Sequence, residues 1–154
     1  MNTLASHMNE ALKIGKNISK FSKYSCRPDN KDELKSIIDD RIEKEGPNCN
    51  LNDIDTSLIT DMSYLFKYSS FNGDISCWNT SKVEDMSGMF YGTPFNSDIS
   101  NWDVSNVKYM GFMFNRTDFN QDISKWKLRK GGCSAIRTFM KCPIRNDYKP
   151  KALR

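Results

Sequence analysis

The chain has 154 residues, of which 38% are hydrophobic and 27% are charged, a balance that favours one globular domain and excludes a disordered chain. No apolar run approaches the roughly 18 residues that a membrane span needs, and the start lacks the apolar core and cleavage site of a secretory signal. The net charge of +4 is uneven: residues 48–125 hold five basic and ten acidic side chains, whereas residues 126–154 hold nine basic and one acidic.

The histidine and cysteine content argues against catalysis and metal binding. His7 is the only histidine, so neither a Ser/His/Asp nor a Cys/His arrangement has a credible base. The five cysteines are an odd number without C-x-x-C spacing, which argues against a zinc site and a disulfide framework. We therefore expect no enzyme, no metal and no cofactor. Reduced cysteines are typical of cytoplasmic proteins, so we expect a protein of the cytoplasm. If a phage encodes the chain, this is the cytoplasm of the host cell.

The spacing of apolar residues predicts an N-terminal arm or helix over residues 1–29. Five apolar side chains are spaced so that they line one helix face, with lysines outside it: Leu4, Met8, Leu12, Ile18 and Phe21. A basic amphipathic helix of this kind can lie on a membrane surface. We prefer a second capping helix or a loosely held arm.

Residues 30–56 predict the N-terminal cap of a repeat stack. Asn30 and Glu33 have the spacing of a capping box, and apolar residues follow at helical spacing: Leu34, Ile37, Ile38 and Ile42. Gly46 and Pro47 then end the run. These signals predict a helix over 31–45.

Residues 57–126 contain a repeat of 24 residues. The segment 71–78, Phe-Asn-Gly-Asp-Ile-Ser-Cys-Trp, recurs with few changes at 95–102 and 119–126. The segment 57–66 recurs in the same register at 81–90 and 105–114. Repeats of this length indicate units that stack, because one unit cannot bury its own apolar face.

Each repeat predicts a short strand followed by a short helix. Ser81 and Glu84 form a capping box, and apolar residues stand at helical spacing: Val83, Met86, Met89 and Phe90. Ile75 is flanked by polar residues, which is typical of a short strand with one buried side chain. We therefore expect an α/β repeat fold, a short leucine-rich-repeat-like solenoid with parallel strands on one side, short helices on the other and a helical N-terminal cap.

Residues 127–154 lose the repeat register. Gly131 and Gly132 interrupt the approach to the expected helix, and the spacing of the following apolar residues is shifted. We interpret this segment as a degenerate C-terminal cap with a basic tail.

The repeated motif D-I-S-x-W-[DN]-[VT]-S-x-V-x-x-M-x-x-M-F stands at 74–90 and 98–114, with partial copies at 51–66 and 122–140. It resembles the BspA-type leucine-rich repeat proteins, which are also known as a bacterial surface-protein repeat of about 25 residues and as a domain of unknown function in mycoplasma lipoproteins. The resemblance covers roughly residues 31–145 and implies a leucine-rich-repeat-like solenoid that binds other molecules. Its better-known members are surface adhesins.

Positions that vary between the repeats are the first candidates for contact with a partner. They flank the predicted strand, where we expect them to be exposed, and form two sets: Gly73, Ser97 and Gln121, and Cys77, Asn101 and Lys125. The recurrent Asp74, Asp98 and Asp122 are expected to form a row. Such a row could bind a cation or a basic partner. We prefer the alternative that each carboxylate accepts a hydrogen bond from a backbone N–H of its own turn. Asn72, Asn96 and Asn120 are expected to form a hydrogen-bonded ladder that serves the backbone.

The basic end supplies the remaining candidates: Lys127, Arg129, Lys130 and Lys141. Clusters of this kind can contact nucleic acid phosphates with salt-dependent affinity. The alternative, which we prefer, is a solvated cap.

We expect a non-catalytic protein-binding repeat module in the cytoplasm, whose protein partner the sequence does not identify. Two alternatives stay open. One is a phage-encoded inhibitor of a host defence nucleoprotein, in which the acidic repeats contact protein and the basic end contacts nucleic acid. The other is a bacterial surface adhesin, which requires an export signal beyond this sequence.

Overall fold

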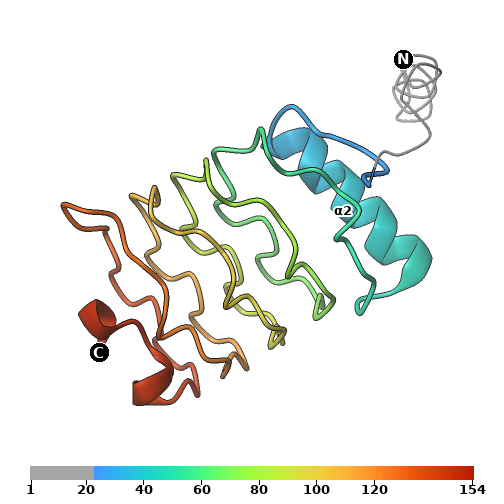
Figure 1. The fold of residues 1–154 in the computed structure, drawn as a ribbon. Coiled ribbons are helices and arrows are strands. Elements are labelled where there is room, and N and C mark those ends of the chain that lie inside the picture. The colour runs from blue at the N-terminus through green and yellow to red at the C-terminus, as the bar shows by residue number, and fades with distance from the viewer. Residues whose placement is uncertain (1–22) are drawn as a thin grey trace.

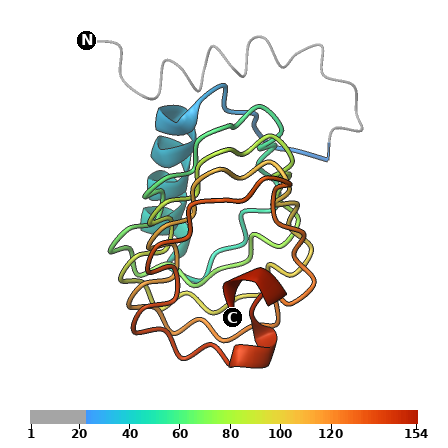
Figure 2. The same ribbon diagram turned by 90° about the vertical axis from the view of Figure 1, so that its left-hand side faces the viewer.

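The structure, a computed structural model, describes residues 23–154. The chain winds into coils that lie one above another (Figure 1), and their outlines nearly coincide when viewed along the stack (Figure 2). Isolated parallel bridges join coils that are mostly 24 residues apart, at Asn50–Asp74, Asp61–Asp85 and Asp85–Tyr109. Most of the arm predicted over residues 1–29, with all five of its apolar residues, lies outside the described residues.

Helix α2 (Lys31–Glu45) covers the N-terminal end of the stack (Figure 1). The Asn30 side chain accepts from the N–H of Glu33 at 3.0 Å, and the Glu33 carboxylate accepts from the N–H of Asp29 at 2.9 Å. Leu34 and Ile38 are fully buried against the first coil. The helix predicted over 31–45 is therefore confirmed, and a cap of this kind contributes about 1 kcal/mol.

The expected α/β solenoid of parallel strands and short helices is wrong. Besides α2, residues 23–154 contain two 3-10 helices, η2 (Asn146–Tyr148) and η3 (Lys151–Leu153), with no further α-helix and no strand or sheet. Of that prediction, the helical N-terminal cap remains.

The segments expected to be helices are runs of β-turns, which we call the turn segments: 62–69, 86–93, 110–117 and 135–142. In the first of them, the N–H groups of Leu65, Lys67 and Ser69 donate to carbonyls three residues earlier at 2.9–3.3 Å. Successive turns begin every two residues. The buried apolar side chains of this segment, Met62, Leu65 and Phe66, stand at i, i+3 and i+4, as they do in a helix. This shared spacing is why the sequence pattern indicated helices.

Hydrogen bonds between coils replace those that an α-helix forms within itself. Every second N–H of a turn segment donates to a carbonyl of the next coil; in the first segment the donors are Met62, Tyr64, Phe66 and Tyr68 and the acceptors are Asp85, Ser87, Met89 and Tyr91, at 2.8–2.9 Å. The same pattern joins the second segment to the third and the third to the fourth. The stack is therefore held by backbone pairing without continuous strands.

Two residues of each turn segment adopt left-handed backbone conformations, with φ between 55° and 70°: Tyr64 and Tyr68, Gly88 and Gly92, Phe112 and Arg116, and Arg137 and Lys141. Left-handed residues cannot continue a right-handed helix, and each costs a side-chain-bearing residue about 1–2 kcal/mol. Because these positions recur in every coil, they exclude α-helices there.

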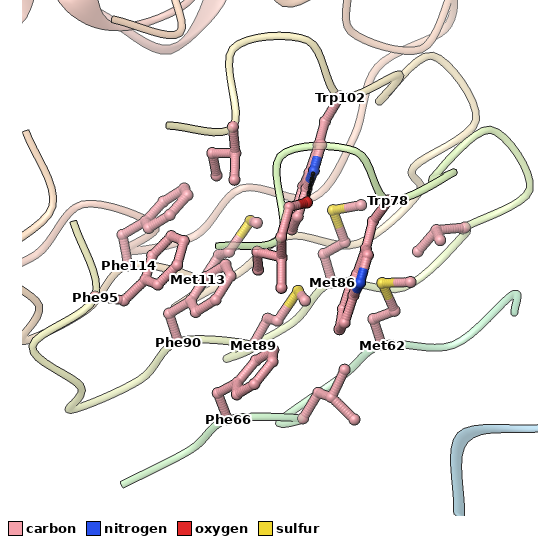
Figure 3. Packing of buried hydrophobic residues seen from close by; sticks show 14 of the residues in the cluster. Met62, Phe66, Trp78, Met86, Met89, Phe90, Phe95, Trp102, Met113 and Phe114 are labelled. Atoms are coloured by element: carbon pink, nitrogen blue, oxygen red, sulfur yellow. Dashed lines mark hydrogen bonds between the residues drawn. The ribbon is translucent and has the colours of Figure 1, made fainter. Parts of the chain in front are cut away.

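Rows of identical side chains fill the interior of the stack (Figure 3). Phe66, Phe90, Phe114 and Phe139 lie with neighbouring ring centroids 5.5–5.7 Å apart. A second row, Phe71, Phe95 and Phe119, packs against the first. Burial of each phenylalanine contributes about 1.5–3 kcal/mol, so these rows supply much of the stabilisation of the stack.

The three tryptophans connect the core to the backbone. The ring of Trp78 lies parallel to that of Trp102, with centroids 6.4 Å apart. The indole N–H groups of Trp78, Trp102 and Trp126 donate to the carbonyls of Leu51, Ile75 and Ile99 at 2.9–3.2 Å. Each tryptophan thereby fixes its own coil to the coil before it.

Candidate interaction surface

The recurrent aspartates serve the backbone, as preferred from the sequence. Asp74, Asp98 and Asp122 each accept from the N–H of the serine two residues later, at 2.8–2.9 Å. Burial raises the pKa of Asp74, but hydrogen bonds from Ser76 and Asn52 outweigh it and hold the pKa below its usual value. These carboxylates stabilise turns, so they are engaged before any partner arrives.

The asparagine ladder is confirmed. The side-chain carbonyl of Asn72 accepts from the N–H of Asn96, and that of Asn96 accepts from the N–H of Asn120, both at 2.8 Å. Ser97 and Gln121 join this ladder, because their side chains donate to the backbone carbonyls of Asn72 and Asn96 at 3.3 and 2.9 Å. Both are half-buried, so these two varied positions form part of the structural framework.

Gly73 is buried, contrary to the expectation that it is exposed. A Cβ atom at this position would lie 2.0 Å from the carbonyl oxygen of Cys49. The residue is glycine because two backbones approach each other closely here. Gly73 therefore has no side chain to offer to a partner.

The other varied set is exposed, as expected. Cys77, Asn101 and Lys125 occupy equivalent positions in successive coils, and each has an exposed side chain. They differ in charge and size and present no shared chemistry, so their row carries no specific functional argument.

The basic candidates Lys127, Arg129, Lys130 and Lys141 all lie exposed on the last coil. Within residues 23–154 none of the four forms a salt bridge. Arg145 is the one cation of the segment 126–154 that pairs with a carboxylate, that of Asp147 at 2.8 Å. The C-terminal end is therefore a strongly positive surface.

The sequence reasoning missed a second surface, which we call the turn face: the solvent-exposed side of the four turn segments with Tyr109 beside them. All of the large hydrophobic residues exposed in the described part of the chain lie here: Tyr64 (49%), Tyr68 (66%), Tyr109 (52%), Ile136 (66%) and Met140 (39%). Single exposed apolar residues are ordinary, but these five all lie in a turn segment or directly before one, which makes the turn face a candidate interaction surface.

Glycines in the second coil make room for two tyrosines of the first. A Cβ atom on Gly88 would lie 2.3 Å from the Tyr64 ring, and one on Gly92 would lie 2.6 Å from the Tyr68 ring. Each ring therefore lies close against the neighbouring coil. This packing holds the rings in place while both side chains stay exposed.

A lysine joins the tyrosines into one cluster. The Lys67 ammonium lies 5.2 Å from the ring centroids of Tyr64 and Tyr68 and 5.7 Å from that of Tyr91. The rings of Tyr68 and Tyr91 meet edge to face at 5.3 Å, and the interaction with the Tyr91 side chain raises the pKa of Tyr68. Cation–π contacts order the lysine, so the cluster is pre-organised.

One sequence signal marks this face. One position of the repeat carries a different side chain in each coil: Tyr64, Gly88, Phe112 and Arg137. It is aromatic in two coils, cationic in one and absent in the glycine. The helix predicted for these segments did not single out this position. The left-handed backbone, which the sequence did not reveal, turns these side chains outwards.

Chemical groups for other functions are few. No cluster of three potential metal ligands occurs in residues 23–154. All five cysteines are free, and burial raises the pKa of four of them: Cys26, Cys49, Cys133 and Cys142. In the same part of the chain, no helix has the length and apolar character needed to cross a membrane.

Comparison with known proteins gives a family for this fold. No curated protein and no solved structure matches the chain. A family model described as a mycoplasma protein of unknown function, DUF285, matches residues 34–145, from α2 to the last coil. The chain belongs to this DUF285 family.

Proposed function

We propose that the protein is a non-catalytic repeat module that binds a protein partner through its turn face. The observation that carries the proposal is the concentration of exposed aromatic and aliphatic side chains on that face. Tyrosines that are ordered before binding lose little conformational entropy, and such residues dominate the energetics of protein interfaces. The first coil contributes the most ordered part, the cluster of Tyr64, Tyr68 and Lys67.

The relationship to BspA-type leucine-rich repeat proteins is part of this proposal. The repeat motif at 74–90 and 98–114 supports it, as does the membership of the DUF285 family. The proposal concerns the repeat motif and its binding role, and it does not extend to strands and helices. We also propose that binding takes place in the cytoplasm, which the cysteine pattern of the sequence supports.

The test removes two rings without disturbing the backbone. Asparagine tolerates left-handed φ, so Tyr64→Asn combined with Tyr68→Asn keeps the turns while deleting the aromatic surface. The tagged full chain and this double variant are used for quantitative affinity purification from the source cells across a range of bait concentrations. We expect a saturable protein partner whose recovery falls at least about tenfold with the double variant, as for the loss of two interface tyrosines.

The matched control changes exposed residues away from the turn face. Asn101→Ser combined with Lys125→Ser alters two side chains of the varied row and should leave recovery of the partner unchanged. Equal loss with both double variants would contradict a role for the turn face. Recovery of no saturable protein at all would contradict the binding function.

A further inference from the structure

The backbone hydrogen bonds between successive coils end at the last coil, which presents a row of N–H donors. In the first three turn segments, every second N–H donates to the following coil at 2.8–3.1 Å. The corresponding N–H groups of the fourth segment belong to Ala135, Arg137, Phe139 and Lys141. None of these four donates a hydrogen bond to any group within residues 23–154. We call this row the open edge.

Different elements lie at the two ends of the stack. At the N-terminal end α2 lies across the first coil, and its Lys31 ammonium bonds to the side chains of Asp61 and Ser63, both at 2.9 Å. At the C-terminal end the segments η2 and η3 lie to one side of the last coil (Figure 2). Tyr148 there accepts from Ile123, which belongs to the coil before. The C-terminal segments therefore leave the four donors unpaired.

The surroundings of the open edge are cationic. Arg137 and Lys141 belong to the row itself, and the Lys149 ammonium lies 5.6 Å from the ring centroid of Phe139. Residues 126–154 hold nine basic and one acidic side chain. A row of N–H donors among unpaired cations attracts a partner that offers acceptors and negative charge. Apolar contacts are available beside it, because Ile136 is 66% and Met140 39% exposed.

We propose that the open edge binds an acidic polypeptide segment, which adds to the stack as a further coil and pairs its backbone carbonyls with the four N–H groups. This inference rests on the proposed protein-binding function and names the chemistry of a partner segment. It does not involve the tyrosines of the first coil. It is a variant of strand addition at a sheet edge, in which backbone hydrogen bonds give affinity and side chains give specificity.

The geometry favours a polypeptide over a nucleic acid. The same set of four donors is occupied three times within this molecule, and each time the acceptors are carbonyls of alternate residues in a coil of the same shape. A phosphodiester chain meets basic surfaces mainly through charge. The ladder therefore supplies a template for a peptide backbone.

The chain itself provides the probe. Residues 83–106 form one complete repeat with four acidic residues and no basic residue, and their turn segment supplies carbonyls to the coil before it. A synthetic peptide of this sequence is titrated into the full-length protein, and amide hydrogen exchange is followed residue by residue by NMR. We expect protection of the amides of Ala135, Arg137, Phe139 and Lys141 to rise at least about tenfold at saturation.

Three controls decide the outcome. A scrambled peptide of the same composition should protect these amides no more than buffer does. In Ala135→Pro, which removes one unpaired donor, the peptide should bind roughly 3- to 10-fold more weakly, as for one lost hydrogen bond. Unchanged protection at Gly88, Phe90 and Gly92 verifies that this variant folds. The variant Tyr64→Asn/Tyr68→Asn should bind the peptide as the wild type does. A result against peptide binding at the open edge can therefore be told apart from a result against partner binding at the turn face.

Two results would overturn the proposal. One is equal protection of the four amides by the designed and scrambled peptides, because binding would then depend on charge alone. The other is equal or greater protection by a 24-nucleotide single-stranded DNA at the same concentration, which would assign the edge to phosphate binding.

Discussion

Asn115 is the residue whose environment fits its chemistry least. Its side chain is fully buried, and neither its amide nitrogen nor its carbonyl oxygen has a partner within residues 23–154. At the equivalent position in other coils stand Lys67, Tyr91 and Met140, which are exposed or half-buried. A buried amide without hydrogen bonds costs about 1–3 kcal/mol, so Asn115 reduces the stability of the stack.

Replacing this amide with an apolar side chain of similar size should stabilise the protein. We expect Asn115→Leu to raise the free energy of unfolding by about 1–3 kcal/mol, because the desolvation cost disappears and apolar burial is gained. Urea unfolding measures the change. The matched control is Asn96→Leu, which removes an amide that does bond to Asn120 and Gln121 and should destabilise by about 1–2 kcal/mol. A loss of stability in Asn115→Leu would show that its amide is satisfied in solution.

At the scale of single elements, the sequence predicted α2 and misassigned the turn segments. In α2 a capping box, a periodic apolar face and a terminal glycine all agree, and no other structure satisfies them together. In the turn segments the spacing of Met86, Met89 and Phe90 suits both a helix and consecutive β-turns. The deciding facts are the left-handed residues and the hydrogen bonds between coils. The left-handed residues and these hydrogen bonds both depend on the stacking of one coil on another. The spacing of residues within one segment therefore does not predict them.

The Asp-x-Ser turns make stability depend on pH. Hydrogen bonds from the hydroxyl and N–H of Ser105 lower the pKa of Asp103 against the opposing effect of burial, below the usual value of 3.8. The pKa values of Asp61 and Asp74 are also lowered, because hydrogen bonds outweigh the raising effect of burial. A carboxylate with a lowered folded pKa stabilises the protein fully above its unfolded value, and this contribution is lost as pH falls through the folded value.

Thermal unfolding across a series of pH values tests this dependence. We expect the Tm of the wild type to fall as pH decreases below about 4. In Asp103→Asn the decline should be shallower, because one titrating group is gone while the turn is kept. Asn79 shows that the amide suits this position, since it accepts from the N–H and hydroxyl of Ser81 at 3.1 and 2.7 Å. An identical decline in both proteins would contradict the assignment of the lowered pKa to Asp103.

At the scale of the whole molecule, the repeat dictates the shape and the exceptions to the repeat indicate function. The recurrent aspartates, asparagines and tryptophans bond to their own or neighbouring coils. The sequence identified the basic end but not the turn face, because the positions of Tyr64 and Tyr68 acquire their exposure from the left-handed backbone. The aromatic side chains of the turn face and the donors of the open edge are both products of stacking.

The measurement that tests this account most directly is amide hydrogen exchange of the free, full-length protein. The structure pairs the N–H groups of Gly88, Phe90 and Gly92 with the third coil and leaves those of Arg137, Phe139 and Lys141 unpaired. We predict that the first set exchanges at least about a thousandfold more slowly than the second, as expected for bonded core amides against open ones. Equal, strong protection of both sets would show that the last coil is covered, and rapid exchange of the first set would contradict the stacked coils themselves.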